Sequence, residues 1–183
     1  MTLLLGTDEA ARALDEMASA IVARGAPAPL IVGVRRGGVA VAQALRERLE
    51  QRCGHAPDFG TIDITLYRDD ASTALPSLRI GPTEIPGSLD GRRVLLVDDV
   101  LFTGRTVRAS LDELFDHGRP GSVELAVLVD RGGRELPIQA DYVGLRVNLD
   151  ADLRVDVLQG KNGLSAIAQP GTTPTSPPPP MNS

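Results

Sequence analysis

The sequence predicts an α/β protein in which a mostly parallel central sheet is flanked by helices. The main observation is that short continuous apolar runs, typical of buried strands, alternate with segments whose apolar residues recur at helical spacing. The second observation is composition, since 183 residues with 42% hydrophobic residues suffice for one domain with a sizeable core. Aromatic residues make up only 3% and tryptophan is absent, so leucine, valine, isoleucine and alanine must build that core.

The first part of the chain predicts two helices and two strands. Thr7 can cap a helix that ends at Gly25, and Asp8 and Glu9 favour the positive end of the helix dipole. A buried strand follows at Leu30–Val34. The apolar residues that mark the other elements are Leu14, Met17, Ala18 and Ile21 in the first helix, Val41, Ala42, Leu45 and Leu49 in a second helix after Gly37-Gly38, and Ile62, Ile64 and Leu66 in an alternating strand.

The second part predicts a long loop, three strands and one helix. Asp69–Leu89 is rich in proline, glycine and serine, which is typical of a long mobile loop. Val94–Val97 predicts a buried strand, and strands are also expected at Val123–Val129 and Asp141–Val147. The helix between the first two of these strands has Val107, Leu111, Leu114 and Phe115 on one face and ends at Gly118.

These elements predict one domain over residues 1–168, followed by a proline-rich tail over residues 169–183. The tail ends in Pro177–Pro180 and carries too few apolar residues to order itself, so we expect it to be disordered.

Composition also excludes several classes of protein. A net charge of −5 argues against a protein that coats nucleic acid without specificity. The single cysteine, Cys53, excludes an intrachain disulfide and fits a reducing compartment. The N-terminus lacks the positive segment of a signal peptide, and no apolar run approaches the roughly 20 residues that span a bilayer. We expect a cytoplasmic protein with no membrane contact.

Ligands of parallel sheets bind beyond the carboxyl ends of strands, so sites are expected just after Val34, Val97 and Val129. At the second of these points, Thr103–Thr106 supplies main-chain N–H groups, two hydroxyls and a helix N-terminus, which together suit a phosphate dianion. Gly104 lets the backbone approach the ligand closely. The adjacent Asp98 and Asp99 would repel a phosphate and instead suit a sugar diol.

Two other interpretations of this segment stay open from the acids alone. Asp98-Asp99 could be a polar strand end followed by a helix that Thr103 caps. The acids could also form a phospho-acceptor site of the receiver type, although the Thr-Gly-Arg-Thr continuation argues against that class. A Walker loop is excluded because the Gly-x4-Gly-Lys pattern is absent.

The segment Val94–Thr106, with the letters VLLVDDVLFTGRT, resembles the PRPP-binding signature of type I phosphoribosyltransferases. Two further segments, Asp63–Asp70 and Leu128–Ile138, resemble the pyrimidine operon attenuation protein (PyrR) family, whose members are also uracil phosphoribosyltransferases. The resemblance covers roughly residues 8 to 158. It implies the type I phosphoribosyltransferase fold, with a small hood and a flexible loop beside the central sheet.

The implied reaction joins uracil to PRPP and gives UMP and pyrophosphate, with Mg²⁺ expected to enter mainly through PRPP. By this resemblance, Asp98 and Asp99 hold the ribose hydroxyls, and Arg35, Arg36 and Arg68 contact pyrophosphate. These five residues are the candidate catalytic residues. The full set implied to bind PRPP or UMP is Arg35, Arg36, Gly37, Arg68, Asp98, Asp99, Val100, Leu101, Phe102, Thr103, Gly104, Arg105, Thr106, Arg131 and Val155, the last through its backbone.

The chain departs from the family pattern at two places. Many members have Thr-Arg-Gly where this chain has Arg36-Gly37-Gly38, a sequence closer to purine-salvage relatives. Phe102 stands where purine relatives commonly place an aspartate that exchanges a proton with the base, and where PyrR members usually carry tyrosine. Phenylalanine cannot exchange a proton, so a 6-oxopurine phosphoribosyltransferase is the disfavoured alternative.

The resemblance also implies a regulator that binds a pyr mRNA leader in response to uridine nucleotides. The matching face of the first helix carries Asp15, Glu16 and Ser19, and Gln139 stands where relatives often have arginine. Acidic groups repel phosphates, so we expect weakened RNA binding, although Arg131 and Arg134 remain. An RNA-binding attenuator with vestigial catalysis is the other alternative. Members of the family form oligomers, so the resemblance implies that this protein forms a homodimer or a higher homo-oligomer.

Overall fold

Five parallel strands form the central sheet of the computed structural model, which describes residues 1–25, 28–64 and 83–171. Their order across the sheet is β3-β2-β4-β5-β6, and every neighbouring pair is parallel. The predicted α/β class is therefore confirmed. The strands are β2 (Leu30–Val34), β3 (Phe59–Ile62), β4 (Arg93–Leu101), β5 (Ser122–Asp130) and β6 (Tyr142–Arg146).

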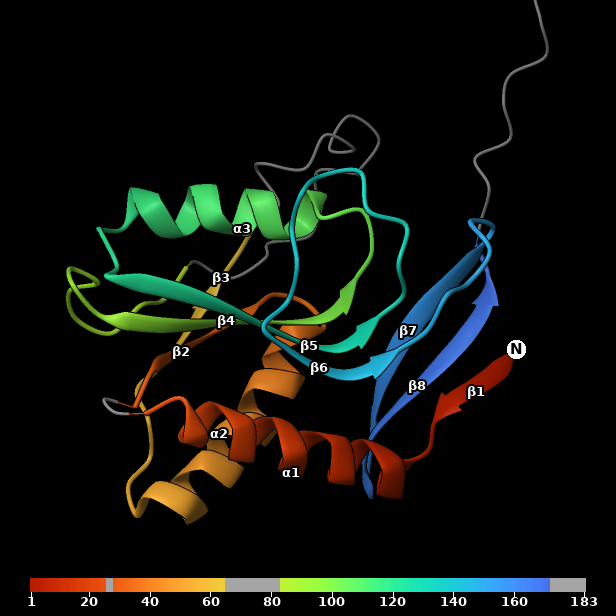
Figure 1. The fold of residues 1–183 in the computed structure, drawn as a ribbon, viewed down its shortest axis with the longest axis horizontal. Helices are drawn as coiled ribbons and strands as arrows, with labels where there is room; N and C mark the ends of the chain where they lie inside the picture. Colours follow the sequence, from red (N-terminus) through yellow and green to blue (C-terminus); the bar gives the residue numbers. More distant parts are fainter. Residues whose placement is uncertain (26–27, 65–82, 172–183) are drawn as a thin grey trace, which may run out of the picture.

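Helices cover both faces of this sheet, with α3 on one face and α1 and α2 on the other (Figure 1). Successive residues of β4 accordingly alternate between two apolar clusters: Leu95 packs with α1 and α2, and Leu96 packs with α3. None of the helices in the described part of the chain is long and apolar enough to cross a bilayer. The helices are α1 (Thr7–Ala23), α2 (Gly38–Cys53) and α3 (Arg105–Asp116).

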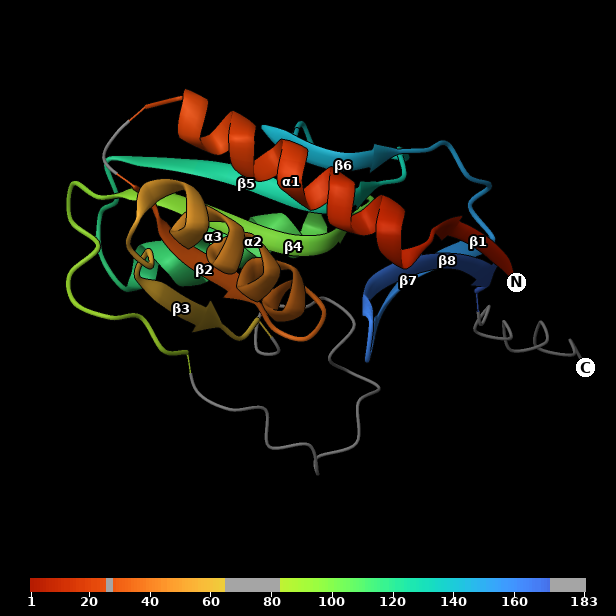
Figure 2. The same ribbon diagram turned by 90° about the horizontal axis from the view of Figure 1, so that it is seen from below.

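A second, antiparallel sheet lies beside one end of the central sheet and forms the hood (Figure 2). It contains β1 (Thr2–Leu5), β7 (Leu153–Gly160) and β8 (Gly163–Pro170) in the order β1-β8-β7. The pairing of Thr2 with Ala168 joins the two ends of the described chain. The strand pattern alone did not predict these three strands, although the family resemblance implied a hood.

Several boundaries differ from the predictions. Helix α1 begins at Thr7, because Gly6 takes the preceding cap position and its N–H donates to Glu9 Oε2 at 2.8 Å. Strand β3 ends at Ile62, and Leu66 lies outside the described residues, as does most of the predicted loop. Strand β8 reaches Pro170, two residues past the expected domain boundary, because Pro170 pairs with Leu153 of β7. Residues 172–183 of the expected tail also lie outside the description.

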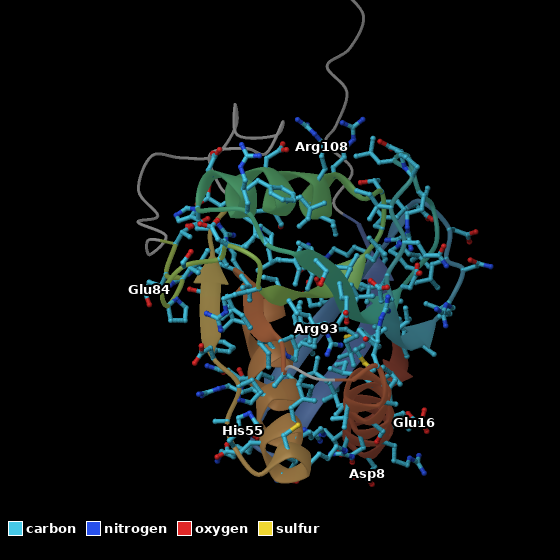
Figure 3. The ribbon with its side chains drawn as sticks, turned by 60° about the vertical axis from the view of Figure 1, so that its left-hand side comes forward. Asp8, Glu16, His55, Glu84, Arg93 and Arg108 are labelled. Atoms are coloured by element: carbon cyan, nitrogen blue, oxygen red, sulfur yellow. The ribbon has the colours of Figure 1, made fainter. Side chains whose placement is uncertain are left out.

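A polar cluster ties the amino ends of the strands to the end of α1, at the edge opposite the expected site. Glu124 accepts two hydrogen bonds from Arg93, both at 2.9 Å, and one from the Tyr142 hydroxyl at 2.7 Å. Arg93 also donates to the carbonyls of Gly25 and Ile21. This cluster therefore fixes β4, β5, β6 and α1 together, and Figure 3 shows Arg93 within the body of the protein.

Candidate active site at the carboxyl ends of three strands

The loop after β2 lies directly against the two acids of β4. A Cβ placed on Gly38 would stand 2.5 Å from the Val97 carbonyl and 2.9 Å from Asp98 Cα. A Cβ on Gly37 would stand 1.8 Å from Asp99 Oδ2, so no side chain fits there with Asp99 in place. The structure thus brings together two of the three predicted strand-end segments.

The acid pair belongs to the strand itself, which corrects the expected strand end at Val97. Strand β4 continues to Leu101 because its pairing with β5 extends to the Leu101–Asp130 register. Asp98 is only 4% exposed, and its Oδ1 accepts the Asp99 N–H at 2.9 Å. Asp99 is half-buried, and its Oδ1 accepts the Val100 N–H at 2.9 Å. These bonds fix the orientation of both carboxylates, whose oxygens are acceptors suited to hydroxyl groups.

The loop after β4 leads directly into the amino end of α3, which is the arrangement that the sequence predicted. Gly104 occupies the cap position with φ 91°, a left-handed conformation that favours glycine. The Arg105 N–H donates to Thr103 Oγ1 at 3.3 Å. The Thr103 carbonyl accepts the N–H groups of Glu135 and Leu136 at 3.0 and 3.1 Å, so the segment after β5 supports the loop. Main-chain N–H groups at the start of this 12-residue helix can bind a phosphate.

Two residues of the predicted binding set direct their side chains elsewhere. Leu101 is 1% exposed and packs in the apolar cluster beneath α3. Arg105 is exposed and its Nε donates to Glu135 Oε2 at 2.8 Å. In this structure both residues therefore shape the loop, and any contact of Leu101 with a ligand would have to come from its main chain.

The two arginines after β2 differ in their surroundings. Arg35 donates from Nε and Nη2 to Thr61 Oγ1, at 3.2 and 2.9 Å, and its Nη2 lies 3.7 Å from Glu84 Oε1. Figure 3 shows Glu84 at the side of the sheet where β3 lies. Arg36 is exposed and has no side-chain partner among the described residues. The peptide between the two arginines is cis. Arg36 is therefore the one free to meet an anion, while Arg35 holds the loop to β3.

Arg131, just after β5, connects the phosphate loop to the hood. Its guanidinium carbon lies 4.0 Å from the centre of the Phe102 ring. Its Nη2 donates to the Asp150 carbonyl at 2.9 Å, and its Nη1 donates to the Leu153 carbonyl. The residue is 4% exposed, and burial lowers the pKa of its guanidinium. Val155 lies two residues after Leu153 in β7, where it pairs with Ala168.

Arg134, which the sequence indicated only as a possible RNA contact, lies against the loop after β4. Its Nη1 donates to the Phe102 carbonyl at 2.8 Å, and its Nη2 lies 2.6 Å from Asp130 Oδ2. Burial alone would raise the pKa of Asp130, but hydrogen bonds from Arg134 and the Gly132 N–H outweigh it and lower that pKa. Residues 131–134 are not helical, so the four-residue spacing of Asp130 and Arg134 gave no signal for this ion pair. Arg68, a predicted pyrophosphate contact, lies outside the described residues.

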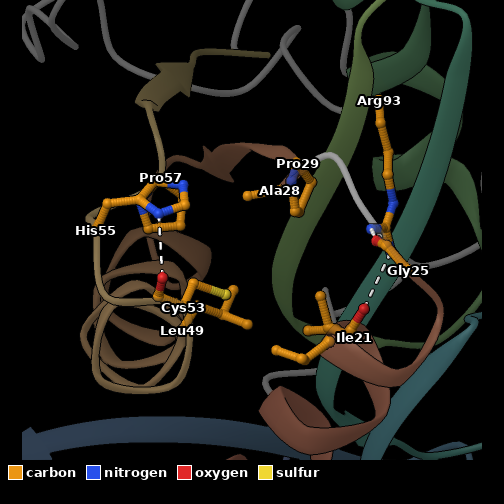
Figure 4. A pocket seen from close by; sticks show the side chains of 10 residues that line it. Ile21, Gly25, Ala28, Pro29, Leu49, Cys53, His55, Pro57 and Arg93 are labelled. Carbon is orange, nitrogen blue, oxygen red and sulfur yellow. Dashed lines mark hydrogen bonds between the residues drawn. The ribbon is translucent and has the colours of Figure 1, made fainter.

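A separate apolar cavity of about 270 Å³ lies between the carboxyl-terminal ends of α1 and α2 (Figure 4). Ile21, Leu49 and Cys53 line it, and His55 Nδ1 lies 3.2 Å from the Cys53 carbonyl oxygen. Arg93 at its edge is already bound to the Ile21 and Gly25 carbonyls. The cavity lies at the amino ends of the strands, away from the acid pair, and it presents no carboxylate.

Comparison with known proteins identifies the family. The phosphoribosyl transferase domain family matches residues 4–159. A protein of Geobacter sulfurreducens named bifunctional protein PyrR is 50% identical over 159 residues, which cover 86% of this chain and 90% of that protein. Proteins of the same name from Deinococcus radiodurans and Streptomyces coelicolor are each 52% identical and cover 77% and 80% of this chain, and 78% and 76% of their own lengths. This chain belongs to the PyrR family. It is a phosphoribosyltransferase.

Solved structures confirm the fold of this PyrR family member. A hypoxanthine-guanine phosphoribosyltransferase from Bacillus anthracis has a TM-score of 0.67 and covers 91% of this chain and 98% of its own. A hypoxanthine phosphoribosyltransferase from Staphylococcus aureus has a TM-score of 0.62 and covers 82% of this chain and 79% of its own. Their identities to the PyrR chain are 17% and 21%, so they show a shared fold and carry no argument about the base.

Proposed function

We propose that this protein transfers the 5-phosphoribosyl group of PRPP to uracil, giving UMP and pyrophosphate. One observation carries the proposal: the Asp98-Asp99 pair lies beneath the Gly37-Gly38 loop and immediately before a phosphate loop that opens α3. A sugar that carries a 5′-phosphate and a 1′-pyrophosphate needs acceptors for its hydroxyls between two anion sites, and this arrangement supplies them in that order.

Each part has a role in the displacement at the ribose. The N–H groups of Thr103–Thr106 anchor the 5′-phosphate at the amino end of α3. Asp98 and Asp99 accept hydrogen bonds from the 2′- and 3′-hydroxyls and favour the positive charge that develops on the ring. The free guanidinium of Arg36 binds the departing pyrophosphate, and the adjacent glycine loop lets the backbone approach it.

Magnesium fits this site as a partner of the substrate. The described residues contain no group of three or more His, Cys, Asp or Glu side chains that could hold a metal alone. Carboxylate oxygens of Asp98 and Asp99, together with phosphate oxygens of PRPP, are the ligands that Mg²⁺ prefers. When bound, the ion would neutralise charge on the pyrophosphate, and the protein's own contribution is to hold the ribose.

The residue at position 102 and the relatives' family favour uracil as the base. Phe102 has no titratable group, so it cannot exchange a proton with a purine as an acid at this place would. Mixing the protein with Mg-PRPP and uracil, orotate or hypoxanthine in separate reactions and measuring pyrophosphate release tests the assignment. We expect release with uracil only. Release with hypoxanthine and none with uracil would refute it.

The relatives' name, bifunctional protein PyrR, favours a second function as a UMP-dependent regulator that binds a pyr mRNA leader. In the region implied to meet RNA, however, Arg131 is buried and Arg134 is engaged with Asp130 and the Phe102 carbonyl. Gln139 is exposed and uncharged. The basic side chains after β5 therefore support the enzyme site, and few remain for phosphate contacts.

The face of α1 that carries Asp15, Glu16 and Ser19 has less uncompensated negative charge than the sequence of the helix alone suggests. Asp15 Oδ1 lies 3.1 Å from Arg48 Nε and 3.4 Å from Arg52 Nη2 of α2, and Arg52 also donates to Ser19. Figure 3 shows Asp8 and Glu16 on the outer side of α1. Asp15 is thus largely compensated, and Glu16 remains as the repelling group among the expected three residues.

We propose weak RNA binding by this protein. A gel-shift assay with its own pyr leader, with and without UMP, measures this property. We expect weak binding that changes only modestly as salt rises, because few phosphates are contacted, and that responds little to UMP. Tight, UMP-dependent binding would overturn the proposed weakening and leave the enzyme proposal intact.

A further inference from the structure

Arg131 is a buried charge without an acidic partner in the described structure. The buried charged residues of the described segments are Asp98, Glu124 and Arg131, and Glu124 is paired with Arg93. Arg131 forms no ion pair with a described carboxylate, and its buried Nε has no hydrogen-bond partner there. Burying a charge is costly unless it is paired, so a chain keeps one only where other contacts or a ligand compensate it.

The contacts of Arg131 hold that charge against Phe102, and the family resemblance implies that both residues bind PRPP or UMP. Its main-chain N–H donates to the Leu101 carbonyl at 3.0 Å, and its guanidinium lies over the Phe102 ring. The backbone at Gly133 also lies against this ring, because a Cβ on Gly133 would stand 2.4 Å from Phe102 Cε2. The hydrogen bonds from Arg131 to the carbonyls of Asp150 and Leu153 also fix the position of the guanidinium. Leu153 lies two residues before Val155.

We propose that Arg131 stabilises the negative charge that develops on uracil during the transfer, an inference that rests on the proposed uracil activity. In the step, N1 of uracil forms a bond to C1′ and the C1′–O bond breaks. The electron pair of that bond leaves with pyrophosphate, and the N1 proton passes to pyrophosphate or water. No side chain at position 102 can take the proton, so a fixed positive charge in a poorly hydrated site replaces a general base.

The test compares two bases of the same shape and different acidity. 5-Fluorouracil has a more acidic N1–H than uracil, so it depends less on help with ionisation. In Arg131→Met, which keeps an apolar stem against Phe102, we expect kcat/KM for uracil to fall on the order of 100-fold. For 5-fluorouracil we expect a loss about tenfold smaller. Arg131→Lys keeps the charge, so it should preserve the wild-type ratio between the two bases even if overall activity falls.

Arg131→Gln is a second neutral variant, whose amide would stand near the position of Arg131 Nε, and it should show the same selective loss. A further measurement needs only the wild-type protein. Uracil bound with an unreactive carbocyclic PRPP analogue should ionise at lower pH than free uracil, as read from its ultraviolet spectrum.

Equal losses on both bases in the neutral variants, no loss, or an unshifted ionisation of bound uracil would each overturn the role of the charge. A wild-type protein that releases no pyrophosphate with uracil would instead refute the proposed function itself.

Discussion

Gly37 and Asp99 illustrate how closely single residues determine this site. Arg36-Gly37-Gly38 follows β2 in this chain, and the structure supplies a physical reason for glycine at position 37. The Asp99 carboxylate fills the space that a side chain would need, with Oδ2 only 1.8 Å from an added Cβ. A residue larger than glycine at position 37 would therefore require the Asp99 carboxylate to move.

Gly37→Ala should displace Asp99 and impair the transfer. We expect kcat/KM for PRPP to fall about tenfold or more, because small misplacements of a catalytic group cost up to about 100-fold. Gly160→Ala is a matched control, since a Cβ there meets only the Gly163 carbonyl at 3.8 Å, and it should leave the rate unchanged. Steady-state kinetics measures both. Full activity in Gly37→Ala would mean that Asp99 is not needed where it lies.

The acid pair and the loop before α3 could be singled out from the sequence because their pattern is local. Asp98, Asp99 and Gly104 lie within seven residues, at a strand end that apolar spacing predicts. The sequence could not separate Arg35 from Arg36, because the partner that engages Arg35 is Thr61 of the neighbouring strand, 26 residues away. It also could not predict that Arg131 is buried, since that depends on carbonyls of the segment before β7.

At the scale of elements, the cluster around Glu124 holds the edge of the sheet opposite the site. Burial alone would raise the pKa of Glu124, but hydrogen bonds from Arg93 and Tyr142 and the charges of Arg93 and Arg24 outweigh it, so the pKa is lowered. A group whose pKa is lowered on folding stabilises the protein above its unfolded pKa, about 4.3 for glutamate, and loses that contribution as the pH falls through its folded pKa.

Glu124→Gln should therefore destabilise the protein at neutral pH, and the loss of stability should be smaller at acidic pH. We expect a loss of about 2 kcal/mol in the free energy of unfolding at pH 7, since bonds to a buried carboxylate are lost and Arg93 is left uncompensated. Urea unfolding at pH 7 and below pH 4 measures the difference from wild type. Tyr142→Phe, which removes one hydroxyl, should cost about 1 kcal/mol. A stability difference between wild type and Glu124→Gln that is larger at acidic pH than at pH 7 would contradict this role of Glu124.

The hood depends on a strand that the sequence argument missed. Leu3 and Leu5 lie in the same short strand β1, and Leu5 is 6% exposed while Leu3 is 64% exposed. Alternating apolar residues around the two-residue turn at Lys161-Asn162 were the available signal for the β7–β8 hairpin. The pairing of β1 with β8 joins residues more than 160 positions apart, which no local pattern reveals.

Leu5→Ala should cost about 2–3 kcal/mol of stability, because it opens a cavity in the cluster that includes β8 and α1. Leu3→Ala is the control from the same strand and should change stability by less than about 0.5 kcal/mol. Thermal and urea unfolding distinguish them. Similar effects of the two substitutions would mean that β1 does not bury Leu5 in this cluster as described.

At the scale of the whole molecule, the site is assembled from the central sheet and the hood. Strand β2 leads into the Gly37-Gly38 loop, β4 carries the acids and leads into the loop before α3, and β5 leads into Arg131. After β6 the chain passes to β7 and returns through β8, which pairs with β1. The class of fold follows from the alternation of helices and strands. The position of the hood relative to the end of β5 does not, because it depends on hydrogen bonds from Arg131 to the carbonyls of Asp150 and Leu153, about 20 residues further along the chain.

The most direct measurement of the central claim is the crystal structure of the protein with UMP. We expect the 5′-phosphate within hydrogen-bond distance of the N–H groups of Thr103–Thr106, and the ribose hydroxyls on Asp98 and Asp99. The double variant Asp98→Asn and Asp99→Asn should then release no measurable pyrophosphate from Mg-PRPP and uracil. A nucleotide bound away from the carboxyl ends of β4 and β5, or an active double variant, would contradict the account.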